Sequence, residues 1–160
     1  MQLTSINSYY LTCGKSEGST ELNAFDGALL NAKIGNMNLL KVSSICPPHC
    51  NELIEITLKK GQLLPVAYAH LKSSDSGKLI SSAVAIAFPK DKNECGVIME
   101  FSMFGPKEYA EKKVREMAIE ALELRKLELL EIKSISIEHC VKNCGCTFAA
   151  VVLHKEKHAR

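Results

Sequence analysis

Two uninterrupted apolar runs, Ala83–Phe88 and Phe148–Leu153, most constrain how this chain can fold. Each has six residues, far fewer than the roughly 20 that an apolar helix needs to span a bilayer. A strand with one solvated face alternates apolar and polar residues, whereas a strand buried on both faces is apolar throughout. We therefore expect a soluble protein in which Phe148–Leu153 is a central strand of a sheet.

Two segments have the spacing of amphipathic helices. Apolar residues recur at Leu22, Phe25 and Leu29, with Ser19 or Thr20 as a cap and Gly35 as a stop, which predicts a helix over about 21–33. A second helix is predicted over about 106–127. Its apolar stripe comprises Ala110, Val114, Met117, Ala118, Ala121 and Leu122.

The remaining segments are rich in β-forming residues and end in turn residues or prolines. The predicted strands, besides Phe148–Leu153, are Ser5–Thr12, Asn38–Ile45, Leu53–Leu58, Leu64–Leu71, Leu79–Phe88, Gly96–Phe104 and Ile132–Ile137. We expect Asn38–Ile45 to be buried and to stop at the two prolines that follow it, and the four strands between residues 53 and 104 to form hairpins. The class is therefore α/β, with two helices laid on β-sheet in a single domain.

Charge and cysteine content exclude several classes of protein. The chain has 20 Lys+Arg and 18 Asp+Glu, a net charge of +2, and no cluster of basic residues for nucleic acid. Its N-terminus lacks the basic start and apolar core of a secretory signal, so we expect a cytoplasmic protein. The cysteine count, seven, is odd, and a chain of this size builds a core without disulfides, so we expect free thiols.

Two segments resemble halves of a metal site: Cys46-x-x-His49-Cys50 and His139-Cys140-x-x-x-Cys144-x-Cys146. A structural zinc site has two well-spaced pairs of ligands, and the spacing here is uneven. We therefore expect thiols and no metal. No glycine-rich phosphate loop occurs either, so the sequence does not support nucleotide chemistry.

Three further positions have both a functional and an ordinary interpretation. Glu100 follows an apolar run, where a carboxyl can serve as a general acid or be a solvated residue at a strand end. Asp26 lies one step off the apolar stripe of the first helix, where it is a surface charge unless a cation pairs with it. Composition and spacing alone assign no role to the pair Ser43-Ser44.

Specific sequence segments nevertheless cover nearly the whole chain: Leu22–Ala32, Ile34–Asn36, Asn38–Leu39, Val42–Pro48, Ile86–Lys92, Cys95–Glu100, Glu111 with Val114–Ala118, and Glu138–His139 with Gly145–Ala150. Together they resemble the archaeal pyruvoyl-dependent arginine decarboxylases. The resemblance implies a four-layer αββα sandwich and a homotrimer of αβ units with active sites between neighbouring subunits.

The resemblance also implies that Ser44 becomes the cofactor. Its hydroxyl would attack the carbonyl carbon of Ser43, and elimination and hydrolysis would leave a covalently bound pyruvoyl group at position 44. Residues 1–43 would become the β chain and residues 44–160 the α chain. The pyruvoyl ketone would form a Schiff base with L-arginine and act as the electron sink for loss of CO2, giving agmatine for polyamine biosynthesis.

Further site residues follow from the resemblance. Glu100 would protonate the α-carbon, and Asn38 would form a hydrogen bond near the pyruvoyl group. Asp26 would pair with the substrate guanidinium, whose planar fork a carboxylate accepts in two hydrogen bonds. The aliphatic part of the substrate would contact Leu22, Gly35, Met37 and Ile45.

Two alternatives stay open. Lys33 and Met37 are larger than the resemblance leads us to expect, and Lys33 alters the charge near the pocket, so the same chemistry could act on another amino acid, such as histidine or ornithine. The other alternative is a trimer that keeps the fold but no longer cleaves itself. It would carry metal on its additional cysteines, Cys50, Cys140 and Cys144.

Overall fold

Two β-sheets packed face to face form the centre of the fold, and one helix covers the outer face of each. The computed structural model describes residues 6–156. The elements in chain order are β1 (Ser8–Glu17), α1 (Glu21–Asn31), β2 (Asn38–Lys41), β3 (Ile45–Cys46), β4 (Asn51–Glu52), β5 (Leu63–Ser73), β6 (Leu79–Pro89), β7 (Gly96–Phe104), α2 (Lys107–Glu123), β8 (Leu129–Cys140) and β9 (Gly145–His154).

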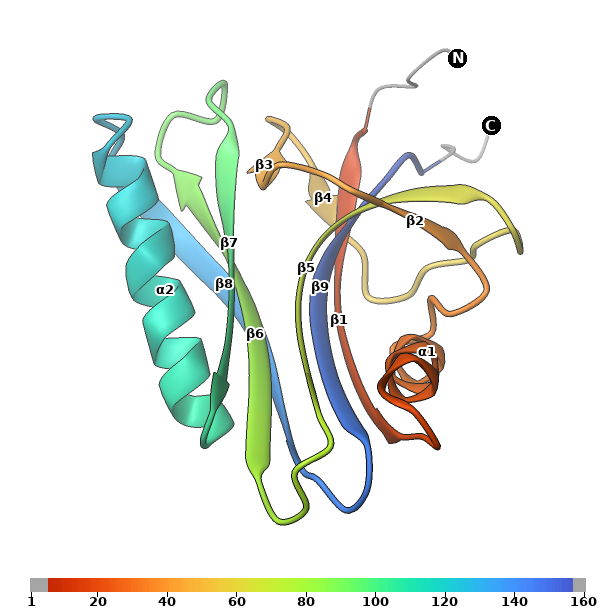
Figure 1. Cartoon of the computed structure of the whole chain (residues 1–160). Coiled ribbons are helices and arrows are strands. Elements are labelled where there is room, and N and C mark those ends of the chain that lie inside the picture. The colour runs from red at the N-terminus through yellow and green to blue at the C-terminus, as the bar shows by residue number, and fades with distance from the viewer. Residues whose placement is uncertain (1–5, 157–160) are drawn as a thin grey trace.

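The five-stranded sheet has the order β2-β5-β9-β1-β4, and the four-stranded sheet has the order β3-β7-β6-β8. Figure 1 shows α2 on the outer side of the four-stranded sheet and α1 on the outer side of the five-stranded sheet. The layers are therefore helix, sheet, sheet and helix, which is the predicted αββα sandwich.

Side-chain alternation along β9 and β6 divides the core into three layers. In β9, Phe148 packs against α1, while Ala149 and Val151 face the other sheet. In β6, Val84 faces between the sheets and Ala85 packs against α2. Both strands are buried on both faces, which explains their continuous apolar runs and confirms the central position predicted for Phe148–Leu153.

The structure corrects several strand predictions. The predicted strand Asn38–Ile45 is two short strands, β2 and β3, in different sheets, and most of β2 is exposed because it is a sheet edge. The predicted strand Leu53–Leu58 has no strand structure. Among the four predicted hairpin strands, only β6 and β7 form a hairpin, because β5 pairs with β9.

The first strand is also shifted toward the C-terminus relative to its prediction. It continues through Gly14 to Glu17, because these residues pair with β9. An added Cβ at Gly14 would lie 2.1 Å from the Ala28 carbonyl oxygen of α1. The glycine allows strand and helix to approach closely and does not end the strand. Ser5, where this strand was predicted to begin, lies outside the described residues.

Both helices end earlier than predicted, and for the same reason. After α1, Lys33 has a φ of 65°, and after α2, Lys126 has a φ of 58°. Each left-handed residue turns the chain so that the amide of the next residue donates a hydrogen bond to a carbonyl of the helix. Ile34 donates to Leu29, and Leu127 donates to Leu122. Glycine is the usual residue at such a position, so the two lysines gave no sequence signal. The predicted cap Thr20 is confirmed, since its side chain accepts the Asn23 amide.

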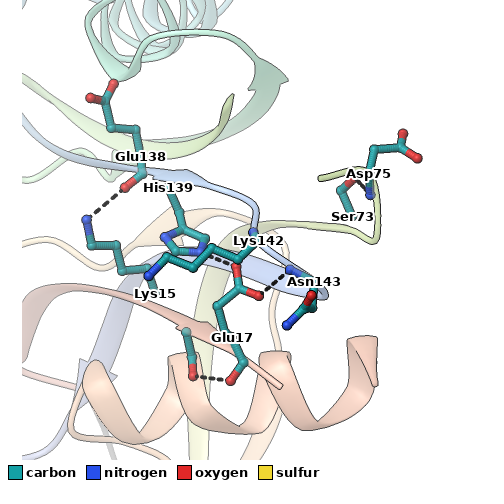
Figure 2. A network of polar contacts seen from close by, with 9 residues as sticks. Lys15, Glu17, Ser73, Asp75, Glu138, His139, Lys142 and Asn143 are labelled. Carbon is teal, nitrogen blue, oxygen red and sulfur yellow. Dashed lines mark hydrogen bonds and ion pairs between the residues drawn. The ribbon is translucent and has the colours of Figure 1, made fainter. Parts of the chain in front are cut away.

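A carboxylate from β1 ties the two sheets together at one end of the fold. Figure 2 shows Glu17 reaching the turn between β8 and β9. One of its oxygens lies 2.5 Å from Nε2 of His139, and its carboxylate accepts the backbone amides of Lys142 and Asn143 at 2.9 Å each. Partial burial raises the pKa of Glu17, but these hydrogen bonds outweigh that effect and hold the pKa at about 2.

We expect Glu17→Gln to remove stability that is present only above acidic pH. A carboxylate whose pKa is lowered on folding stabilises the protein above its unfolded value of 4.5, and that stability is lost as pH falls toward 2. Urea unfolding at pH 7 should show a loss of about 1 to 2 kcal/mol, because the group remains partly exposed to water. At pH 2 the variant and the parent should be nearly equally stable. An equal loss at both pH values would contradict this role.

Two other acidic residues attach α2 to the edge strand β8. Glu111 accepts hydrogen bonds from the hydroxyls of Ser134 and Ser136, each at 2.7 Å. Glu138 accepts the Lys107 amide at 2.9 Å and so satisfies a free donor at the N-terminus of α2. Glu111, Glu138 and His139, which belong to the segments that resemble the decarboxylase family, therefore hold the layers in place.

No helix within residues 6–156 is long and apolar enough to cross a membrane.

Candidate functional site

The chain passes from one sheet to the other at the Ser43–Ser44 peptide bond. On one side of this bond, the Val42 amide donates to the Val66 carbonyl in the five-stranded sheet, at 3.2 Å. On the other side, the Ile98 amide of β7 donates to the Ser44 carbonyl, at 2.8 Å. Ser43 is the exposed residue between the two attachments. Each side of the bond is therefore fixed to a different sheet (Figure 1).

Ser44 has an unusual backbone conformation. Its φ is 33°, in the left-handed region that residues with a side chain rarely adopt. Holding a residue other than glycine there costs on the order of 1 to 3 kcal/mol, and such strain is concentrated at functional sites. The structure therefore singles out one serine of the Ser43-Ser44 pair, which the sequence pattern could not do.

The Ser44 hydroxyl donates a short hydrogen bond, 2.6 Å, to Oε1 of Glu100. Glu100 lies in the interior of β7, on the same strand face as Ile98, because side chains alternate along a strand. That face looks toward the five-stranded sheet, and Glu100 is half-buried there. The bond to Ser44 excludes the interpretation of Glu100 as a solvated residue at a strand end.

Besides Ser43, Ile45 is the only other predicted site residue next to Ser44 and Glu100 within residues 6–156. It begins β3, pairs with Val97 of β7 and is 36% exposed. It can therefore present an apolar surface next to Ser44. The backbone anchor from Ile98 was not predicted, and no side-chain pattern could have indicated it, because it depends on strand pairing between distant segments.

The predicted substrate residues Asp26 and Leu22 lie in a different part of the chain. Both are on α1, where Leu22 is 71% exposed and Asp26 is also exposed. None of the ion pairs between described residues involves Asp26. The five-stranded sheet separates α1 from β7, so these residues face away from Glu100.

The other predicted residues lie on the segment that connects α1 to β2. At Gly35 an added Cβ would lie 2.7 Å from the Leu30 amide nitrogen, so the close approach to α1 requires glycine. Met37 packs against the core beneath α1. Asn38 begins β2, and its side-chain amide donates to the Gly61 carbonyl at 2.8 Å. The site residues thus form two groups, one at Ser44 and one around α1.

The cysteine-rich segments do not gather ligands in the described part of the chain, since residues 6–156 contain no group of three or more His, Cys, Asp or Glu side chains placed to hold a metal. A pocket of about 340 Å³ lies outside the Ser44 site. Its lining includes Tyr9, His49, Cys50 and Glu94 but neither Ser44 nor Glu100.

Comparison with known proteins finds one family over nearly the whole chain. A family model described as "Pyruvoyl-dependent arginine decarboxylase (PvlArgDC)" matches residues 8–158. Curated relatives named pyruvoyl-dependent arginine decarboxylase include one from Methanocaldococcus jannaschii, 50% identical over 92% of this chain and 89% of the relative. Others come from Methanococcus aeolicus, 46% identical over the same shares, and Pyrococcus abyssi, 40% identical over 96% of this chain and 98% of the relative.

Proposed function

Because this chain belongs to the family of pyruvoyl-dependent arginine decarboxylases, we propose that it cleaves itself at Ser43–Ser44 and decarboxylates L-arginine to agmatine and CO2 with the pyruvoyl group so formed. The observation that carries the proposal is the hydrogen bond from the strained Ser44 to Glu100, at the crossing between the sheets. The enzyme would act in the cytoplasm, at the entry to polyamine synthesis.

Glu100 is placed to start the self-cleavage. Its carboxylate, 2.6 Å from Oγ of Ser44, can accept the hydroxyl proton as that oxygen attacks the carbonyl carbon of Ser43. The C–N bond then breaks, and an ester joins residue 43 to the Ser44 oxygen. Elimination frees residues 1–43 and leaves dehydroalanine at position 44, which takes up water and loses ammonia.

Backbone strain and anchoring favour cleavage at this bond. The left-handed conformation at Ser44 raises the energy of the uncut chain, and cutting the bond before Ser44 releases that strain. The anchors at Val42 and Ile98 lie on opposite sides of the bond, so both new ends stay attached to their sheets. The products are therefore expected to remain one folded unit.

The residues around position 44 suit a pyruvoyl group, since serine is the common hydroxyl residue that yields one and a carboxyl group lies beside it. When present, the pyruvoyl ketone condenses with the substrate α-amino group and accepts the electrons released as CO2 leaves. Glu100 then holds a proton for the substrate α-carbon. Ile45 provides apolar surface next to it.

The substrate guanidinium is assigned to Asp26, which we place in the site of a neighbouring subunit. Asp26 and Ser44 lie on different sides of the five-stranded sheet, so one chain does not bring them together. Two exposed apolar side chains on α1, Leu22 and Leu30, support a subunit interface on this side. We propose the homotrimer of the family, with Leu22, Gly35, Met37 and Asn38 beside Asp26 at each interface.

We expect Asp26→Asn to cleave itself normally but to lose arginine activity. Replacing the carboxylate removes a charge-assisted pair with the guanidinium, and kcat/KM for arginine should fall about 10² to 10³-fold. Activity is measured as CO2 release per pyruvoyl group. Asp75→Asn, at an exposed turn, is the matched control and should behave as the parent. An unchanged rate for Asp26→Asn would remove its assigned role.

Mixing two inactive variants tests whether sites are shared between subunits. Asp26→Asn subunits carry an intact Ser44, and Ser44→Ala subunits carry an intact Asp26. If each active site combines Ser44 of one subunit with Asp26 of another, unfolding and refolding the two variants together should restore part of the activity. No recovery from a mixture shown by native mass spectrometry to contain mixed trimers would contradict shared sites.

A further inference from the structure

The hydrogen-bond ladder between β2 and β5 stops one rung before the Ser43–Ser44 bond. These two strands are parallel, and the last amide to donate across them is that of Val42, which reaches the Val66 carbonyl at 3.2 Å. In a parallel ladder, the amides that donate to the neighbouring strand lie two residues apart, and so do the carbonyls that accept them. The next rung would therefore join the Ser44 amide to the Tyr68 carbonyl.

The side chain of Lys41 takes this rung instead. Its Nζ donates to the Tyr68 carbonyl at 3.3 Å and lies 4.5 Å from the centre of the Tyr68 ring. Lys41 is exposed, and none of the ion pairs between described residues involves it. One charge-assisted hydrogen bond and one cation–π contact therefore hold its ammonium group at the edge of β5.

The Ser44 amide is left without this acceptor, and no group among residues 6–156 accepts a hydrogen bond from it. An amide held in the ladder would keep Ser44 in extended backbone, with a φ of about −120°. The observed φ is 33°. The chain therefore turns out of the five-stranded sheet at Ser44, and the Ser44 hydroxyl reaches Glu100 of the other sheet.

We propose that Lys41 is a positioning residue for self-cleavage: by occupying the Tyr68 carbonyl, it ends the ladder at the scissile bond and keeps the Ser44 amide free. This inference rests on the proposed self-cleavage and assigns Lys41 no contact with the reacting atoms. When the hydroxyl attacks, the Ser43 carbonyl carbon becomes tetrahedral and the Ser44 nitrogen loses the planar geometry of a peptide bond. A hydrogen bond from that nitrogen to the sheet would resist the change.

The rate at which newly synthesised protein cuts itself tests the proposal. Lys41→Met removes the ammonium group and keeps an unbranched side chain. In a pulse-chase experiment, the half-life of the uncut chain should lengthen about 10-fold, the effect of losing one hydrogen bond from a charged donor. Lys41→Arg keeps a charged donor and should restore a rate close to that of the parent. Lys112→Met, which removes an exposed lysine of α2, is the matched control and should cut like the parent.

Hydrogen exchange at the amide of residue 44 measures the positioning itself. Ser44→Ala provides a chain that stays uncut, so the amide can be followed by NMR with and without Lys41→Met. Adding Lys41→Met should slow exchange of this amide about 10-fold, because it can then donate to the vacated Tyr68 carbonyl. The Val42 amide, which donates to the Val66 carbonyl, is the internal control and should exchange equally in both proteins.

The outcomes separate this inference from the proposed function. If the parent cuts itself and Lys41→Met cuts at the same rate, the role of Lys41 is wrong and the proposed function stands. A parent that stays uncut would overturn both. Equal slowing in Lys41→Arg and Lys41→Met, or equal exchange at residue 44 with and without Lys41→Met, would also overturn the role of Lys41.

Discussion

Replacing Ser44 by alanine should leave the protein as one uncut chain without decarboxylase activity. The methyl group of alanine has no nucleophile for the Ser43 carbonyl, so neither the ester nor the pyruvoyl group can form. The fold should persist, because both backbone anchors are made by main-chain atoms and do not need the side chain. Denaturing mass spectrometry and CO2 release from labelled arginine measure the two losses together.

A matched variant tests whether replacing an exposed serine elsewhere in the chain has the same effect. Ser76 is exposed in the turn between β5 and β6, and Ser76→Ala should be cut and active like the parent. Circular dichroism of Ser44→Ala should match that of the parent. A Ser44→Ala protein that is uncut but decarboxylates arginine would show that activity does not need the pyruvoyl group, and the proposed mechanism would be wrong.

The second large effect is expected for Glu100→Gln. Glutamine keeps the size of the side chain but cannot take the Ser44 proton or return one to the substrate α-carbon. The uncut chain should therefore persist for much longer. In the fraction that does cleave, decarboxylation should be slowed about 10² to 10⁴-fold, the usual contribution of a positioned general acid or base.

Dividing the rate by the amount of pyruvoyl group distinguishes the two roles of Glu100. A slow cut with a normal rate per pyruvoyl group would restrict Glu100 to self-cleavage, and a normal cut with a slow rate would restrict it to decarboxylation. Glu128→Gln removes a carboxylate of the exposed ion pair with Lys90 and is the control. Normal cleavage and a normal rate for Glu100→Gln would contradict both assignments.

The sequence predicted the layers of this fold better than its edges. Apolar continuity identified the central strand β9, because a strand buried on both faces has no polar alternation. The same reasoning failed for Asn38–Ile45, whose two halves belong to different sheets. A strand that changes sheets has no characteristic pattern, since each half is too short to establish its own periodicity.

For the candidate site, the resemblance supplied residues that the pattern alone could not. Neither composition nor spacing distinguishes Ser44 from Ser43, whereas backbone conformation and the bond to Glu100 do. The partners of Glu17 were also beyond prediction, because His139 is 122 positions away in the sequence. Contacts between the two ends of a sandwich depend on the assembled sheets.

The most direct test of self-cleavage is the intact mass of the purified protein under denaturing conditions. We expect two species that divide the sequence between Ser43 and Ser44, with residues 44–160 blocked at their N-terminus by a ketone that borohydride reduces. A single uncut species of 17.6 kDa that persists on long incubation would contradict the account, because a chain that never forms the pyruvoyl group cannot use it to decarboxylate arginine.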